Sequence, residues 1–115
     1  MTGRPPTPAR PLDVWALNIY LARGKARDAL IEQGMAEHIV QVRGIVAVRT
    51  QKAAMNAFGV TRIYLVGWGG ITANRVEQEI ARADPGVVYV TSDSTPSGRA
   101  GYVRWGTGEA APTTP

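Results

Sequence analysis

The sequence contains no cysteine and a single histidine, His38. Without cysteine the chain has no disulfides, no thiolate metal ligands and no cysteine nucleophile. His38 has no partner at the spacing of a metal site or a catalytic triad, and the serines do not occur in the G-x-S-x-G pattern of serine hydrolases. We therefore expect no metal site, no catalytic residues and no enzymatic activity.

Long apolar runs are also absent. No run approaches the roughly 18 residues that a membrane-spanning helix needs, and the first residues, MTGRPPTPARP, lack the apolar core of a signal peptide. Arginine greatly outnumbers lysine, which is typical of GC-rich genomes. These features predict a cytoplasmic protein of a bacterium or its phage, with no membrane contact.

Acidic residues are missing from the middle of the chain, between Glu37 and Glu77. The cations in this interval are Arg43, Arg49, Lys52, Arg62 and Arg75. Such a stretch produces a local positive field that attracts phosphate or an acidic partner. The alternative is a solvated basic surface whose charge is compensated by acidic residues elsewhere in the fold.

Composition and length indicate one domain flanked by two tails. Hydrophobic residues make up 44% and charged residues 19% of the 115 residues, as is usual for globular proteins. Residues 1–11 are rich in proline, residues 107–115 lack apolar periodicity, and both segments are predicted to be disordered. Residues 12–106 are long enough to form a single α/β domain with one hydrophobic core.

Apolar periodicity and turn residues divide this domain into helices and strands. Helices are predicted at 12–24, 25–34, 50–59 and 72–84, and strands at 38–48, 61–68, 87–93 and 102–106. The strand at 38–48 could instead be a hairpin bent at Gly44. The order ααβαβαββ predicts a small α/β or α+β fold of about four strands with right-handed crossovers, in which the last two strands are antiparallel.

Three of the predicted helices have recognisable ends or an unusual surface. Thr50 is a candidate N-cap for the third helix, which would stop at Gly59. Thr72 or Asn74 would cap the fourth helix, and Asn74 with Glu77 has the spacing of a capping box. The first helix is apolar nearly all round from Val14 to Ala22, so we expect it to be central or to contact another subunit or protein.

A glycine-rich segment, GWGGIT, separates the predicted strand 61–68 from the last helix. Its spacing, Gly67-x-Gly69-x-x-Thr72, resembles the dinucleotide-binding fingerprint of Rossmann folds, with Asp93 at the end of the following strand in the place of the ribose-binding acid. The fingerprint's third glycine is absent, and no Walker lysine follows. We expect the segment to be structural, ending the strand and turning the chain into the helix, and we predict no cofactor. A nucleotide site at Gly67–Thr72 is the alternative.

Strand alternation suggests where a partner would bind. If the aliphatic sides of the strands meet the helices, the opposite side of the sheet collects aromatic rings and arginines. These residues are Arg62, Tyr64, Trp68, Tyr89, Tyr102 and Arg104, with Arg99 in the neighbouring loop and Arg43, Arg49 and Lys52 in the basic stretch. Rings that stack on bases and arginines that bind phosphates are typical of single-stranded nucleic-acid recognition.

The sequence therefore predicts a small basic binding protein, with single-stranded nucleic acid as the favoured partner. A protein interface is the main alternative, because the aromatic face or the helix from Val14 to Ala22 could instead contact another subunit of an assembly or virion. The third hypothesis is a nucleotide-binding domain that uses the Gly67–Thr72 turn. The aromatic residues could also simply belong to the core, since tyrosine and tryptophan favour strands in any case.

Overall fold

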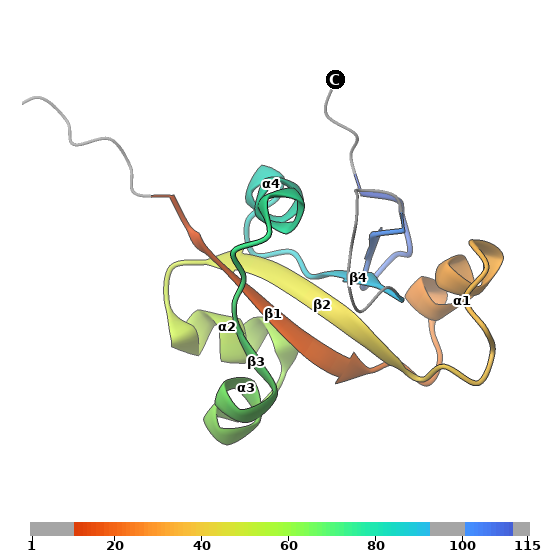
Figure 1. The fold of residues 1–115 in the computed structure, drawn as a ribbon, viewed down its shortest axis with the longest axis horizontal. Coiled ribbons are helices and arrows are strands. Elements are labelled where there is room, and N and C mark those ends of the chain that lie inside the picture. The colour runs from red at the N-terminus through yellow and green to blue at the C-terminus, as the bar shows by residue number, and fades with distance from the viewer. Residues whose placement is uncertain (1–10, 93–100, 112–115) are drawn as a thin grey trace, which may run out of the picture.

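Two long strands form the centre of the sheet in the computed structural model, which describes residues 11–92 and 101–111 (Figure 1). Strand β1 (Asp13–Tyr20) pairs antiparallel with β2 (Gln41–Val48) along its whole length. Three shorter strands extend the sheet in the order β3-β1-β2-β4-β5, with every neighbouring pair antiparallel. The short strands are β3 (Gly69–Ile71), β4 (Tyr89–Thr91) and β5 (Val103–Arg104).

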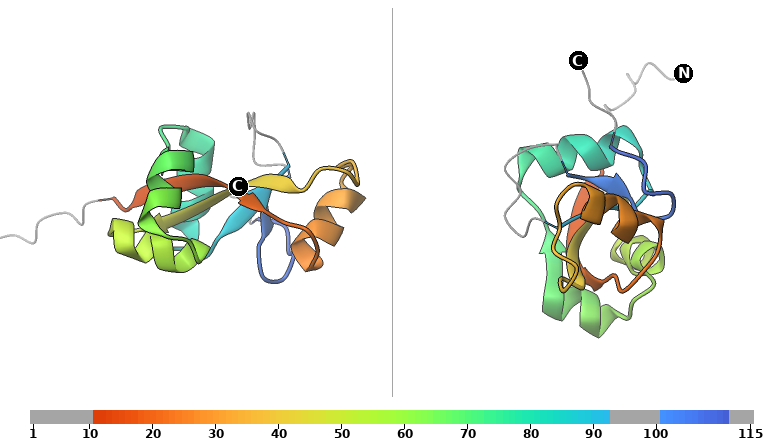
Figure 2. Two further views of the ribbon diagram at one scale, coloured as in Figure 1. Left: turned by 90° about the horizontal axis from the view of Figure 1, so that it is seen from below. Right: turned by 90° about the vertical axis from the view of Figure 1, so that its right-hand side faces the viewer.

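Helices cover both faces of this sheet. They are α1 (Lys25–Glu32), α2 (Gln51–Phe58), α3 (Arg62–Trp68) and α4 (Arg75–Ala83). Figure 2 shows α4 on one side of the two long strands and α2 on the other, with α1 near the end of the strands opposite to α2. The described residues thus form an α+β domain, which confirms the predicted fold class.

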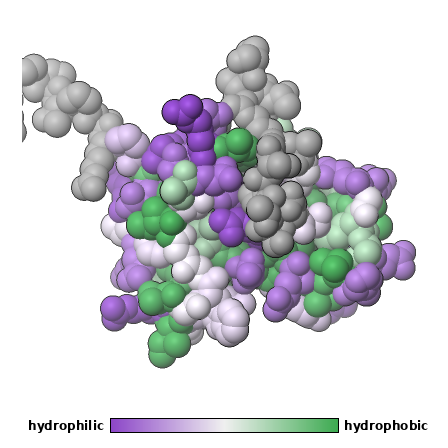
Figure 3. All heavy atoms as spheres, in the orientation of Figure 1, coloured by the Kyte–Doolittle hydropathy of each residue, from purple (hydrophilic) through white to green (hydrophobic). Residues whose placement is uncertain are grey.

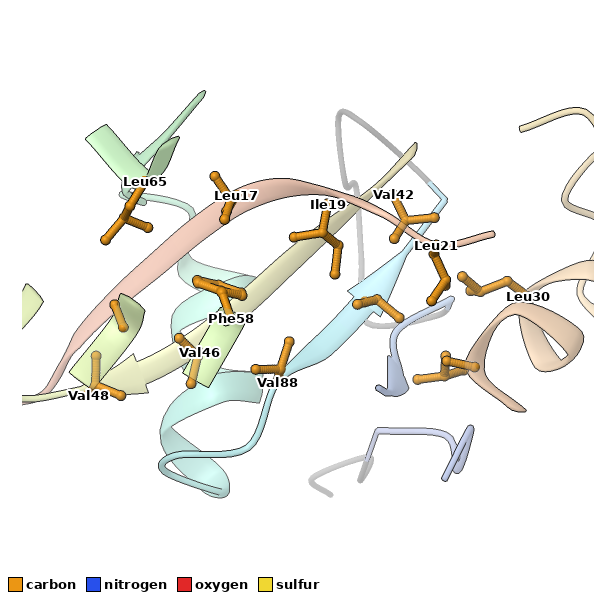
Figure 4. Packing of buried hydrophobic residues seen from close by; sticks show 14 of the residues in the cluster. Leu17, Ile19, Leu21, Leu30, Val42, Val46, Val48, Phe58, Leu65 and Val88 are labelled. Carbon is orange, nitrogen blue, oxygen red and sulfur yellow. The ribbon is translucent and has the colours of Figure 1, made fainter. Parts of the chain in front are cut away.

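Alternation along β1 and β2 divides the buried apolar side chains into two layers. One layer lies between the sheet and helices α1, α2 and α3 (Figure 4) and includes Leu17, Val46, Phe58 and Leu65. The other lies beneath α4 and includes Ile45 and residues of β1, β2, α4 and β4. Because both faces of β1 and β2 are covered, these strands are apolar on both sides.

Close packing explains the glycine in the middle of β2. A Cβ atom at Gly44 would lie 3.1 Å from Phe58 Cε1 and 3.3 Å from Ile19 Cδ1. The absence of a side chain therefore lets α2 approach the sheet. β2 continues straight through this position, so the alternative of a hairpin bent at Gly44 is wrong.

Several predicted elements and caps are confirmed. Residues 25–32, 51–58 and 75–83 are helical, and β4 and β5 form the expected antiparallel pair. Thr50 Oγ1 accepts a hydrogen bond from Ala53 N at 3.1 Å, and Gly59 ends α2 in the left-handed conformation with φ of 69°. Asn74 Oδ1 caps α4 by accepting from Glu77 N at 3.1 Å.

The predicted helix from Val14 to Ala22 is wrong, because this segment contains strand β1. An apolar run that lacks clear periodicity fits a doubly buried strand as well as a buried helix. Here β2 and β3 flank the run, and helices cover both faces of most of it. A helical interface at these residues is therefore excluded, and the sheet is antiparallel instead of being built from right-handed parallel crossovers.

The predicted strand at 61–68 is also wrong, because the segment forms helix α3. Its β-branched and aromatic residues favour a strand, but Thr61 Oγ1 accepts from Tyr64 N at 3.3 Å and so caps a helix. Tertiary contacts then hold that helix in place. Leu65 is fully buried, and Tyr64 Oη donates to the backbone oxygen of Asn18 at 3.1 Å.

The predicted tails at 1–11 and 107–115 lie mostly outside the described residues. Within the described part, Ala110 forms a β-bridge with Val103, and Ala111 is buried. The packed region therefore extends to residue 111. Among the described residues, no helix is both long enough and apolar enough to cross a membrane.

Candidate binding site at the β1–β3 edge

The predicted aromatic and arginine face does not form. Tyr89 and Tyr102 point toward α4 and are buried, with 3% and 1% of their surface exposed. Tyr64 and Trp68 belong to α3 and not to a strand. These rings therefore lie on different elements and share no exposed sheet face, because α4 covers the side on which they were expected. Arg99 and Asp93 lie outside the described residues.

The predicted cations are scattered over the fold. Arg49, Lys52, Arg62 and Arg75 are exposed on four different segments. Arg104 lies 3.7 Å from Asp84 in a partly exposed ion pair. Arg43 lies on the side of the sheet that α4 covers, and about a quarter of its side chain is exposed.

Arg43 binds a fully buried carboxylate on α4. Its Nε donates to Glu77 Oε2 at 2.6 Å, and its Nη2 donates to Glu77 Oε1 at 2.9 Å. Thr72 Oγ1 also donates to Oε1, and Tyr102 Oη donates to Oε2, each at 2.7 Å. Each carboxylate oxygen therefore accepts from two donors, which uses the hydrogen-bonding capacity of the group. The cluster joins β2, α4 and the segments next to β3 and β5.

Electrostatics keep both members of this pair charged. Burial raises the pKa of Glu77, but the hydrogen bonds from Arg43, Tyr102 and Thr72 outweigh it and hold the pKa below its usual value. The hydrogen bond to Glu77 raises the pKa of Arg43. A buried ion pair with this geometry fixes the orientation of its two side chains. Its net contribution to stability is small, because removing both charges from water offsets much of their attraction.

From the sequence, Glu77 was identified only as a candidate capping residue. The capping-box spacing predicted that its side chain would bond back to the backbone of Asn74. The backbone N–H of Asn74 instead donates to Thr72 Oγ1 at 3.1 Å, which leaves the Glu77 carboxylate free to point into the interior. The capping pattern therefore identified Glu77 but did not predict that its side chain points into the interior.

The glycine segment has a structural role, although the elements differ from those expected. Gly69 ends α3 and begins β3, and its N–H donates to Leu65 O. Thr72 N donates to Val14 O at 2.9 Å. A Cβ atom at Gly69 would lie 2.5 Å from Ala16 O, so the glycine is required by the close approach of β1. None of Gly67, Gly69 and Gly70 has a positive φ.

A hollow of about 250 Å³ lies beside this segment, on the same side of the sheet as α4. Arg43 and Asn18 lie opposite each other on β2 and β1 and line the hollow together with Trp68 and Gly70. A Cβ atom at Gly70 would meet no atom within 4 Å, so the missing side chain leaves this space open. The hollow thus combines a guanidinium, an amide and an indole.

Exposed apolar side chains also occur on α3 and on β3 next to the hollow. The exposed fractions are 86% for Ile63, 57% for Val66, 68% for Trp68 and 57% for Ile71. Figure 3 shows hydrophobic side chains on the outer surface at the end of the molecule where α3 and β3 lie. Most of the large exposed apolar residues among those described thus fall within one short segment. We call these four residues the α3–β3 surface.

No group of three or more potential metal ligands occurs in the part of the chain that the structure describes. Comparisons of the chain with protein-family models, with curated proteins and with solved structures found no match. The function is therefore inferred from the residues of this chain alone.

Proposed function

We propose that the chain is a non-enzymatic binding protein that docks a segment of another protein on the α3–β3 surface. The observation that carries this proposal is the exposure of Ile63, Val66, Trp68 and Ile71 on one short helix and the adjoining edge strand. A cluster of exposed large apolar residues is typical of a protein interaction site, whereas single exposed ones are common everywhere. Tryptophan in particular is enriched among the residues that dominate binding energy.

The edge of the sheet offers backbone groups next to these side chains. Along an antiparallel strand, the backbone N–H and C=O groups of successive residues point alternately toward and away from the neighbouring strand. Because Thr72 N donates to Val14 O, these groups point toward β1 at Gly70 and away from β1 at Ile71. No strand of the described chain pairs with this outer side of β3. An extended segment could therefore add to the edge and place alternate side chains on the apolar surface, as in other cases of strand addition.

Charge indicates the chemistry of the docked segment. Arg62 lies one helical turn from Val66 on α3, and Arg43 lines the hollow beside Trp68. Between Glu37 and Glu77 the chain has no acidic residue, and Glu77 itself is buried. The matching partner is thus a segment with apolar residues flanked by aspartate or glutamate. A second copy of this chain fits less well, because it would place like charges opposite each other.

A peptide-display selection against the immobilised full-length chain tests the proposal. We expect the selected peptides to combine alternating apolar residues with acidic ones. Val66→Lys and Ile71→Lys should each weaken the binding of such a peptide by about tenfold or more, because a charge replaces a buried apolar contact. Binding should also weaken as salt is added.

Val40→Lys is the matched control, because Val40 is also an exposed valine but lies outside the α3–β3 surface. It should leave peptide binding unchanged. Selected peptides that bind the Val66→Lys variant as tightly as the wild type would contradict the proposal. It would also be contradicted by a stable homodimer that Val66→Lys dissociates, or by tight binding of a single-stranded oligonucleotide that Val66→Lys abolishes.

A further inference from the structure

The outer edge of the Arg43 guanidinium has unused hydrogen-bond donors. Of its five N–H groups, two donate to Glu77, and the guanidinium also forms a hydrogen bond with Tyr102. The remaining N–H groups have no acceptor among the residues that the structure describes. About a quarter of the side chain is exposed, and it lines the hollow beside β3. The group is therefore bound firmly on its inner side and open on its outer side.

Glu77 neutralises the charge of Arg43 within the pair, but it occupies only the inner donors of the guanidinium. Both oxygens of Glu77 already accept hydrogen bonds from Thr72 and Tyr102 as well as from Arg43. Glu77 also lies in the first turn of α4, where the helix dipole stabilises a negative charge. Glu77 is thus fixed in the interior and holds Arg43 in one orientation, in which the guanidinium lines the hollow and can donate further hydrogen bonds there.

The walls of the hollow restrict what can bind there. Asn18 lies directly opposite Arg43 and presents an exposed amide, and Gly70 leaves the floor free of side-chain atoms. Two of the backbone N–H groups nearby are already used, since Gly69 N donates to Leu65 O and Thr72 N donates to Val14 O. A phosphate site normally adds several such N–H groups or further cations. One guanidinium edge and one amide instead match a singly charged, planar carboxylate.

We infer that this hollow binds the carboxylate of an aspartate or glutamate side chain from the docked segment. The carboxylate would accept from Arg43 Nη1 and Nη2 and from the Asn18 amide, with Trp68 beside it. This inference deepens the proposed function and rests on it for the source of the carboxylate. The site itself can be tested without any protein partner.

The test uses ¹⁵N-labelled full-length protein titrated with sodium acetate, with sodium chloride at the same ionic strength as the reference. Acetate should cause saturable shifts of the Arg43 Nε–H and of the Gly69 and Gly70 amides, with a dissociation constant on the order of 10 mM, as expected for hydrogen bonds to a charged group and tighter than for an exposed surface ion pair. Inorganic phosphate should bind no more tightly than acetate.

Arg43 itself is a poor choice for substitution, because its removal would leave Glu77 buried without a partner. Asn18→Asp instead supplies a carboxylate opposite Arg43 and should weaken acetate binding by about tenfold or more through competition. Asn56→Asp is the matched control on the exposed side of α2 and should have no effect. Gly70→Val should block the hollow, whereas Gly106→Val, also in open space, should not.

Acetate shifts equal to those caused by chloride would overturn the inference, as would binding that survives both Asn18→Asp and Gly70→Val. Tighter binding of phosphate than of acetate would overturn the assignment to a carboxylate. The two proposals fail separately. If acetate does not bind but apolar peptides still depend on Val66, only the inference about the hollow is wrong. If acetate binds but peptide selection ignores Val66, the docking proposal is wrong.

Discussion

Arg43 on β2 donates to Glu77 on α4 through two hydrogen bonds, of 2.6 and 2.9 Å, and this pair joins the central strand to the helix above it. The two residues come from distant parts of the chain, and the rest of the layer beneath α4 is largely apolar. Arg43 and Glu77 can form these hydrogen bonds only when α4 lies at one position along the sheet. We therefore expect the pair to determine the position of α4 on the sheet, in addition to the orientation of the Arg43 side chain.

Replacement of Glu77 with glutamine should reduce stability. The amide offers one acceptor oxygen and no charge, so one Arg43 N–H and the hydroxyl of either Tyr102 or Thr72 lose their acceptor. Breaking a buried ion pair costs about 3–5 kcal/mol, and the partial exposure of Arg43 reduces the expected loss to somewhat below that range, at about 2–3 kcal/mol. Urea denaturation at neutral pH measures it. Glu32→Gln, an exposed site on α1, is the control and should cause little change.

The same carboxylate predicts a pH dependence. Because the folded state holds the pKa of Glu77 below its ordinary value of 4.5, its contribution to stability is complete above pH 4.5 and is lost as the pH falls through the lower, folded-state pKa. The urea midpoint of the wild type should therefore drop on acidification, and that of Glu77→Gln should drop less. Parallel pH profiles for the two proteins would contradict this assignment.

Tyr102→Phe tests the contribution of the Tyr102 hydroxyl to the cluster. The variant keeps the buried ring but removes the hydroxyl that donates to Glu77 Oε2 at 2.7 Å. A hydrogen bond to a charged group contributes about 1.5–3 kcal/mol, so a loss of unfolding free energy in this range is expected. Tyr20→Phe, at a tyrosine with 66% of its surface exposed, should be nearly neutral in the same measurement.

Two glycines of the GWGG segment should respond to alanine in opposite directions. At Gly69 the new methyl group would lie 2.5 Å from Ala16 O and 2.9 Å from Leu17 Cδ1, so a loss of about 2 kcal/mol or more is expected from the forced shift of β1. At Gly67, inside α3, the methyl group meets no atom, and a gain of about 0.5–1 kcal/mol is expected from helix propensity. Thermal or urea unfolding of both variants checks the pair, and a Gly69→Ala variant as stable as Gly67→Ala would contradict the packing argument.

Local signals in the sequence determine much of this fold without tertiary contacts. Thr50 and Gly59 delimit α2, and Asn74 begins α4, because caps and left-handed glycines act through bonds to backbone groups only a few residues away. The β-branched run in β2 and the turn before β4 follow from equally local preferences. The sequence was also sufficient to predict the α+β class and the antiparallel pairing of the last two strands.

Only the tertiary structure decided the states of β1 and α3. The run from Val14 to Ala22 is apolar enough for a buried helix or a doubly covered strand, and the choice depends on which elements lie on either side of it. In α3 the strand preference of Ile63, Val66 and Trp68 gives way to the Thr61 cap and the burial of Leu65 against β1. The candidate site depends on both outcomes. Arg43, Asn18 and Trp68 meet only because β1 lies between β2 and β3, and such long-range pairings leave no periodic pattern in the sequence.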